Sequence, residues 1–200
     1  AALKEAGVAM NGTKEAADIV GKALADRLGI AYYDKDNIID LVAEDCGLAR
    51  QSVVELMERK TSSLLYEMAT FAHTNPLEEQ VFLSKNRVIN ALADQGSMVI
   101  VGSCGDYVLR DRERLLKVFL YGSIEQRIDR IVIVYKDTVS LSPQKLKSMD
   151  KSRADYYRFF TSYKWGDWTN YDILFNTDLG LDPVTDMLEH IANVRFGGEA

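Results

Sequence analysis

The sequence predicts an α/β fold with three layers, in which a central parallel sheet of about five strands lies between two layers of helices. Two observations carry this prediction. Short apolar runs without polar alternation, such as Met98–Val101, are typical of strands that are buried on both faces. Segments with helical periodicity lie between these runs and are joined to them by short loops, which favours parallel strands.

The chain begins with a strand, a turn and a helix. Gly7–Met10 is a short apolar run, and Asn11–Thr13 follows it as a turn. Lys14–Leu28 has its apolar residues on one helical face and ends at Gly29, a typical C-terminal cap residue. Ile30–Tyr33 is the second expected strand.

The middle of the chain is expected to be mostly helical before it reaches a buried strand. Asp36 or Asn37 is expected to cap a helix, and Leu77–Asp94 is expected to form a longer one. The segment Thr61–Pro76 has no clean periodicity and ends in a break at the proline. Met98–Val101 is the third strand and the most apolar of the set.

The remaining strands are Val118–Tyr121 and Ile173–Phe175. Gly102–Asp106 is expected to join the third strand to a short helix. Ser123 caps a helix that carries Arg127 and Arg130 one turn apart. A C-terminal helix opens at Asp182.

Aromatic and basic side chains alternate in Lys147–Thr177, the stretch around which the chain is organised. It contains both tryptophans, Trp165 and Trp168, together with Lys151 and Arg153. One interpretation is a packed aromatic helix that leads into a buried strand, because aromatic stripes at helical spacing are usually core. The other is a surface that stacks a flat ring and pairs with phosphates.

Composition limits the function classes. The 200 residues, 47% of them hydrophobic, suit a single domain spanning 1–200. A formal net charge of -6 argues against nucleic-acid binding and against a membrane-surface role. Cys46 and Cys104 have no metal-ligand spacing, and no apolar run has the length of a membrane helix. A cytoplasmic protein without a metal centre of its own is expected.

Four segments resemble one family in the same order. They read KALADRLGIAYYDKDNIIDLVAEDCGL, VINALADQGSMVIVGSCGDYVLRDR, LKVFLYGSIEQRIDRI, and D-K-x-R-x-x-Y-Y followed by KWGD, NYD and N-T. Over about Ile19–Ile191 the chain is similar to the cytidylate kinase-like family, whose members are P-loop proteins related to nucleoside monophosphate kinases. The resemblance implies a P-loop NTPase-like fold with a helical lid at about 136–170. It also implies transfer of the γ-phosphoryl group of ATP, with Mg²⁺, to a nucleoside monophosphate such as CMP.

The resemblance implies site residues as well. The expected catalytic cations are Arg127, Arg130, Lys151 and Arg153. The expected nucleotide-binding residues are Gly12, Thr13, Lys14, Asp34, Ser103 and Asp106. Four aromatic residues are expected to pack the lid, namely Tyr156, Tyr157, Trp165 and Tyr171. His73 and His190 are assigned no role.

The phosphate loop departs from the family pattern. The family has approximately G-S-G-G-R where this chain has Lys14–Asp18, so the glycines are lost and Glu15 and Asp18 bring like charge to the phosphates. This stretch is therefore expected to be a loop or a first helical turn without a strong anion site. Gly7–Lys14 offers an alternative, because it reads G-V-A-M-N-G-T-K and is close to G-x-x-x-x-G-K-[ST]. That alternative requires the preceding strand to come from Ala1–Ala6.

Two further departures lie downstream. The family's G-R-C-A-D reads Gly102–Asp106 here, and Ser103 cannot replace the charged fork of the arginine that would grip the acceptor's phosphate. The run Ile131–Lys136 is apolar where the family is polar, which indicates either ordinary core or a partner contact.

Three hypotheses about function follow. The protein is an active nucleoside monophosphate kinase, or a kinase-like protein without catalysis that binds a nucleotide or a protein partner, or an enzyme of another phosphoryl specificity. A homodimer is also compatible with the sequence. The fold is the same in each case, so the site must decide between them.

Overall fold

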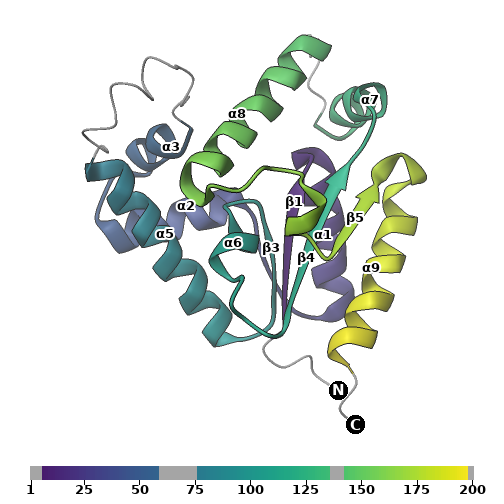
Figure 1. Ribbon diagram of the computed structural model, residues 1–200, viewed down its shortest axis with the longest axis horizontal. Coiled ribbons are helices and arrows are strands. Elements are labelled where there is room, and N and C mark those ends of the chain that lie inside the picture. The colour runs from purple at the N-terminus through teal and green to yellow at the C-terminus, as the bar shows by residue number, and fades with distance from the viewer. Residues whose placement is uncertain (1–5, 59–75, 136–141, 198–200) are drawn as a thin grey trace.

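The computed structural model of the protein describes residues 6–58, 76–135 and 142–197 (Figure 1). Its sheet has five parallel strands in the order β2-β3-β1-β4-β5. The strands are β1 (Gly7–Gly12), β2 (Ala31–Tyr33), β3 (Met98–Val101), β4 (Leu115–Tyr121) and β5 (Ile173–Asn176). The predicted parallel sheet is confirmed, and Met98–Val101 is an inner strand with every residue buried.

β1 is longer than the sequence predicts, and this matters for the site. Asn11 and Gly12 were expected to form a turn, but they continue the strand and pair with Phe119 and Leu120 of β4. The reason is that β4 extends over seven residues and offers a full edge to its neighbour. Gly12 has φ +113°, and a Cβ there would lie 1.9 Å from the carbonyl oxygen of Leu120. Only glycine fits that close approach.

Side chains alternate along the inner strands and so divide the core into two halves. Val8 and Met10 of β1 pack on one face, together with α1 (Lys14–Leu28) and α9 (Leu181–Phe196). Ala9 points to the opposite face. α1 ends at Gly29 with φ +64°, as the sequence predicts.

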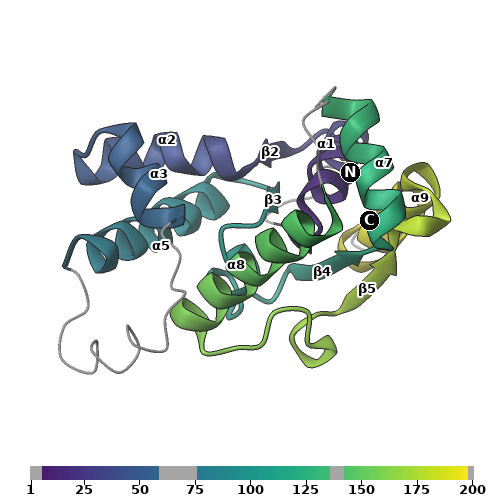
Figure 2. The ribbon, with the colours of Figure 1, turned by 90° about the horizontal axis from the view of Figure 1, so that it is seen from above.

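The opposite face is covered by α2 (Lys35–Cys46), α3 (Arg50–Glu58) and α5 (Pro76–Gln95). Figure 2 shows these three helices on one side of the sheet and α1 and α9 on the other. Buried residues of the second half include Ile38, Val53, Ile89 and Ile100. The predicted three layers are therefore present.

Three further helices lie near the carboxyl ends of the strands. They are α6 (Gly105–Val108), α7 (Ile124–Tyr135) and α8 (Pro143–Thr161). Ser142 caps α8, since its hydroxyl accepts a hydrogen bond from the Lys145 amide, and Pro143 follows at the first helical position. Two 3-10 turns, Trp168–Asn170 and Thr177–Leu179, flank β5.

Two local expectations are wrong. α2 is capped by Asp34 instead of Asp36 or Asn37, and the Asn37 amide completes a capping box. On α7, Ile131 is buried as core, whereas Val132 and Ile133 are exposed, Ile133 at 75%, so these two residues are not core. The break before Pro76, His73 and positions 136–141 of the expected lid lie outside the described residues.

None of the helices in the described part of the chain is long and apolar enough to cross a membrane.

Candidate nucleotide site

A cavity of about 450 Å³ lies at the carboxyl ends of β1 and β3. Parallel α/β sheets bind their ligands at this position, where neighbouring strands lead into different connections. Its walls come from α1, α2, α3, α8 and the loop after β3. The apolar part of the lining is Ala17, Met57, Val101, Met149, Tyr156, Tyr157 and Trp165.

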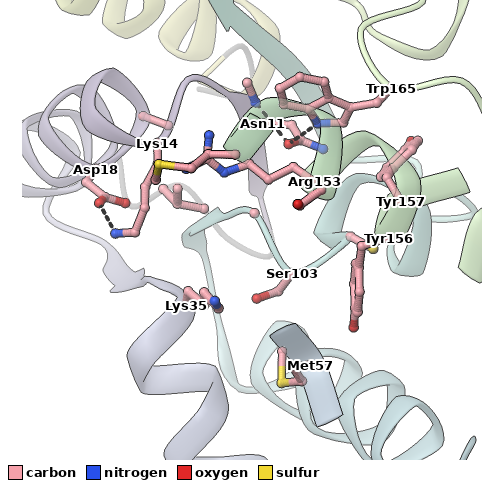
Figure 3. Close-up of a pocket in the computed structure, with 17 residues that line it drawn as sticks. Asn11, Lys14, Asp18, Lys35, Met57, Ser103, Arg153, Tyr156, Tyr157 and Trp165 are labelled. Atoms are coloured by element: carbon pink, nitrogen blue, oxygen red, sulfur yellow. Dashed lines mark hydrogen bonds and ion pairs between the residues drawn. The ribbon is translucent and has the colours of Figure 1, made fainter. Parts of the chain in front are cut away.

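Three cations enter the same cavity from different elements. Lys14 is on the first turn of α1, Lys35 begins α2 and Arg153 is on α8 (Figure 3). Lys14 forms an ion pair with Asp18 at 2.6 Å, and Arg153 forms one with Asp150 at 2.8 Å. A cavity with aromatic walls and several cations suits a ligand that has a flat ring and an anionic group.

The connection from β1 to α1 contains a single residue. β1 ends at Gly12 and α1 begins at Lys14, so only Thr13 stands between them. The Lys14–Asp18 stretch is helical, as one of the two predicted forms requires. The alternative loop over Gly7–Lys14 is wrong, because Gly7–Gly12 is the strand itself and cannot fold around a phosphate.

Glu15 lies buried in the first turn of α1. Arg127 of α7 donates a hydrogen bond from Nε to Glu15 Oε1 at 2.7 Å. The Arg127 side chain is 5% exposed and the Glu15 side chain 4%. Arg127 also donates from Nη1 and Nη2 to the two carboxylate oxygens of Asp150, at 2.6 and 3.0 Å. Asp150 in turn accepts from Arg153. This chain of ion pairs connects α1, α7 and α8.

A polar network forms below the cavity. The Tyr157 hydroxyl donates to Asp106 at 2.6 Å, and burial raises the pKa of Asp106 although this hydrogen bond works against the rise. Trp165 donates from its indole nitrogen to the side-chain oxygen of Asn11 at 2.9 Å (Figure 3). Asn11 reaches Tyr171 through its amide nitrogen at 3.4 Å. These hydrogen bonds fix the end of β1 and the aromatic wall together.

The loop after β3 presents Ser103 to the cavity. Ser103 has φ +55° and Cys104 has φ +57°, and such left-handed conformations are uncommon outside glycine. The Ser103 hydroxyl oxygen is buried and has no hydrogen-bond partner among the described residues. In Figure 3 it lies across from Lys35. An unpartnered hydroxyl in a cavity wall is a natural contact for a polar ligand atom.

The structure brings together some of the expected site residues and separates others. Gly12, Lys14, Ser103 and Arg153 line the cavity. Six others are not part of the cavity lining, namely Thr13, Asp34, Asp106, Arg127, Arg130 and Lys151.

Each of these six side chains has another environment. Asp34 caps α2, Asp106 belongs to the network below the cavity, and Arg127 joins the buried ion pairs. Arg130 donates to the carbonyl of Thr177 at 3.3 Å. Lys151 is exposed on α8, and Thr13 is buried with its hydroxyl oxygen unpartnered in the described part of the chain.

Sequence reasoning missed Lys35 and Lys85, and it read Glu15 only as a defect. Lys85 is fully buried beside the cavity wall and donates to the Tyr156 hydroxyl at 2.8 Å. A signal for it did exist. Val81, Lys85 and Ile89 are spaced four residues apart, which places the lysine on the inward stripe of α5.

The residues present do not fit the triphosphate of a nucleotide donor. Such a group needs a loop whose amide groups surround the phosphates at the start of the first helix. Here the turn has one residue, and the buried Glu15 carboxylate occupies the first turn of α1. The described residues also contain no group of three or more histidine, cysteine or acidic side chains that could hold a metal ion.

The parallel sheet, the order of its strands and a cavity at their carboxyl ends define a protein with the fold of P-loop kinases. The chain belongs to the cytidylate kinase-like family, whose model matches residues 16–179. The match begins inside α1, so Thr13 and Glu15 lie outside it. Among curated protein sequences no match was found.

Solved structures share the fold at low sequence identity. An uncharacterised protein from Eubacterium ventriosum ATCC 27560 is 22% identical, with a TM-score of 0.68 and coverage of 96% of this chain and 100% of that one. Shikimate kinase from Bacteroides thetaiotaomicron is 13% identical, with a TM-score of 0.56 and coverage of 93% and 97%. A gluconokinase from Sinorhizobium meliloti 1021 is 14% identical, with a TM-score of 0.54 and coverage of 97% of both chains.

Proposed function

We propose that this cytidylate kinase-like domain binds a phosphorylated nucleoside, such as CMP, in the cavity and does not transfer a phosphoryl group from ATP. The proposal rests mainly on the buried ion pair between Glu15, in the first turn of α1, and Arg127 of α7. A carboxylate there repels an incoming phosphate, and it already satisfies an arginine that the resemblance assigns to catalysis.

The proposal of a nucleoside monophosphate rests on the lining of the cavity. Trp165, Tyr156 and Tyr157 provide aromatic surface for a base, and Arg153 provides a charged fork for a phosphate. A cavity of about 450 Å³ is in the size range of small-molecule sites. The family match supports a nucleotide as the class of ligand.

The second candidate is an active phosphotransferase that uses ATP and Mg²⁺. Family membership and the named kinases among the structural neighbours favour it. It would require Glu15 to leave its position, because donor phosphates and this carboxylate cannot share the start of α1.

The test is to titrate the protein separately with CMP, with AMP and with MgATP in a calorimeter, and to assay ADP formation with CMP as acceptor. We expect a nucleoside monophosphate to bind and MgATP to give neither tight binding nor turnover. Steady ADP formation that Arg153→Ala abolishes in the folded protein would establish the phosphotransferase instead. If no nucleotide binds to the folded protein, a nucleotide is not the ligand and the proposal is wrong.

Glu15→Ala provides a second arm of this test. Removing the carboxylate frees Arg127 toward the start of α1, while Asp150 still holds the other side of its guanidinium. We expect the variant to bind inorganic phosphate or MgATP more tightly than the wild type does. The matched control is Asp26→Ala, which removes an exposed carboxylate from the same helix, away from both the buried pair and the cavity. Equal phosphate affinity in Glu15→Ala and the wild type would contradict the role given to Glu15.

A further inference from the structure

Lys85 is a buried cation that pairs with no carboxylate in the described part of the chain. Its side chain is 0% exposed, and no Asp or Glu among the described residues lies within ion-pair distance of its ammonium group. Fully buried lysines are rare unless they are paired. A charge kept in such a place therefore needs an explanation beyond packing.

Aromatic rings take the place of a counter-ion. The Lys85 ammonium nitrogen lies 4.7 Å from the ring centre of Phe82 and 5.6 Å from that of Phe160. These two rings stack on each other at 4.4 Å, and Tyr156 packs against Phe160 at 4.7 Å. The electron-rich faces of such rings stabilise an ammonium group in a site without water. Burial disfavours the charge, but Cys104, Tyr156 and Asp106 together raise the pKa of Lys85 above its ordinary value.

Within the described ranges, Lys85 makes one hydrogen bond, to the Tyr156 hydroxyl at 2.8 Å. An ammonium group can only donate, so the Tyr156 oxygen is the acceptor and keeps its own proton for another partner. Burial raises the pKa of Tyr156, with Lys85 acting in the opposite direction, and the phenol stays protonated at neutral pH. In the described part of the chain this O–H group donates to no protein atom.

Tyr156 also lines the cavity, on the side opposite Lys14 and Asp18 (Figure 3). A hydroxyl that accepts from a cation becomes a stronger donor, because the two hydrogen bonds polarise one another. The positive charge therefore lies one side chain behind the cavity wall.

We propose that Lys85 and Tyr156 act together as the element that selects an anionic ligand, with the Tyr156 hydroxyl donating to a phosphate oxygen of the ligand and Lys85 polarising and positioning that hydroxyl from behind. This inference rests on the proposed function, because it names how the same cavity distinguishes a phosphorylated nucleoside from a free one. It also offers a substitute for the arginine that the family has at the position of Ser103, because Lys85 supplies a positive charge that a serine lacks.

The effect of Lys85 and Tyr156 on binding can be distinguished experimentally from that of the cavity cations Arg153 and Lys14. Arg153 contacts Asp150 and Lys14 contacts Asp18, whereas Lys85 contacts no carboxylate among the described residues. Salt screens partly exposed charges far more than buried ones. The contribution of Lys85 to phosphate preference should therefore persist at high salt, while that of Arg153 declines.

The experiment compares CMP with cytidine, and AMP with adenosine, by calorimetry on the wild type, Tyr156→Phe, Lys85→Met and the double variant. Tyr156→Phe removes one oxygen atom and leaves the ring in the wall. We expect it to weaken CMP binding about ten-fold and to leave cytidine binding unchanged, as the loss of one charge-assisted hydrogen bond requires. Lys85→Met should do the same, and the double variant should lose no more than either single one.

A purely structural role gives different results. In that case Tyr156→Phe and Lys85→Met would weaken nucleoside and nucleotide binding alike, or change neither. Their effects on binding would also add in the double variant. An unchanged ratio of CMP to cytidine affinity in Tyr156→Phe overturns the inference while leaving the proposed function intact. If Lys85→Met does not fold, the Tyr156→Phe ratio and its persistence at high salt decide the question alone. If the wild type binds none of the four probes, the proposed function fails and this inference falls with it.

Discussion

Glu15 and Arg127 are 112 positions apart in the chain and form a buried ion pair at 2.7 Å. The pair joins α1 to α7, and Asp150 extends it to α8. In nucleotide kinases, cations near the lid meet phosphates of the nucleotide. Here Arg127 instead forms ion pairs with Glu15 and Asp150 of the chain itself. These pairs hold α7 and α8 against α1 without a ligand.

Arg127→Met should lower the free energy of unfolding by roughly 3–5 kcal/mol, because it leaves the buried Glu15 carboxylate without a partner. Glu15→Gln should cost less, about 1–3 kcal/mol, since Arg127 keeps its two hydrogen bonds to Asp150. Urea unfolding followed by circular dichroism measures both. Lys22→Met is the control, because Lys22 pairs with Asp26 on the exposed face of α1. Equal stabilities for Arg127→Met and Lys22→Met would show that the buried pair has no structural role.

Arg153→Ala should weaken phosphate-ligand binding ten- to hundred-fold, as expected for the loss of a charge-assisted contact of roughly 1.5–3 kcal/mol. Lys151→Ala is the matched control, because it removes a cation two positions away that is exposed and does not line the cavity. Titration of both variants with CMP makes the comparison. Equal losses in the two variants would mean that the general charge of α8 matters more than contact with the cavity.

Ligand binding should change the fluorescence of one tryptophan and not the other. Trp165 lines the cavity and packs against Phe119 at a ring distance of 5.1 Å, whereas Trp168 is 73% exposed. Trp168→Phe should keep a fluorescence change on CMP addition, and Trp165→Phe should lose it. The opposite assignment would place the ligand outside the cavity.

Trp165→Ala should also destabilise the fold by roughly 3 kcal/mol, because it removes a ring from the aromatic wall and the indole hydrogen bond to Asn11. Trp168→Ala should leave the denaturation midpoint nearly unchanged, since its ring is exposed. Chemical denaturation of the two variants distinguishes them. A larger loss in Trp168→Ala would contradict the packing described for both residues.

The contribution of Asp106 to stability should fall as pH rises above about 4. Burial raises the pKa of this carboxyl above its unfolded value of about 3.9. Its protonated form therefore favours the fold below the unfolded pKa, and that contribution is lost as pH rises through the folded pKa. Asp106→Asn should remove this loss, so its free energy of unfolding should gain on that of the wild type as pH rises from about 4. Urea titrations at several pH values, with Asp111→Asn as an exposed control, measure the difference. Parallel curves for wild type and Asp106→Asn would contradict the assignment.

Much of the fold could be predicted from the sequence, because hydrophobic pattern and turn chemistry are local. Apolar runs identify β3 and β4, and the periodicity of Lys14–Leu28 with Gly29 identifies α1 and its end. The loss of the phosphate-loop glycines is likewise visible from residue types alone. The length of β1 could not be predicted, since Asn11 and Gly12 read locally as a turn and become strand only through pairing with β4.

The arrangement of the site depended on the tertiary structure. The sequence alone indicates charges at Arg127, Lys151 and Arg153, but only the packing of α7 and α8 on α1 decides that one is buried, one exposed and one in the cavity. Charge type is a property of a residue, whereas its partner depends on which distant elements the sheet brings together. Glu15 looks like a defect in a phosphate loop when the chain is read in order. Beside Arg127 it is a counter-ion, because folding places the two at 2.7 Å where water is excluded.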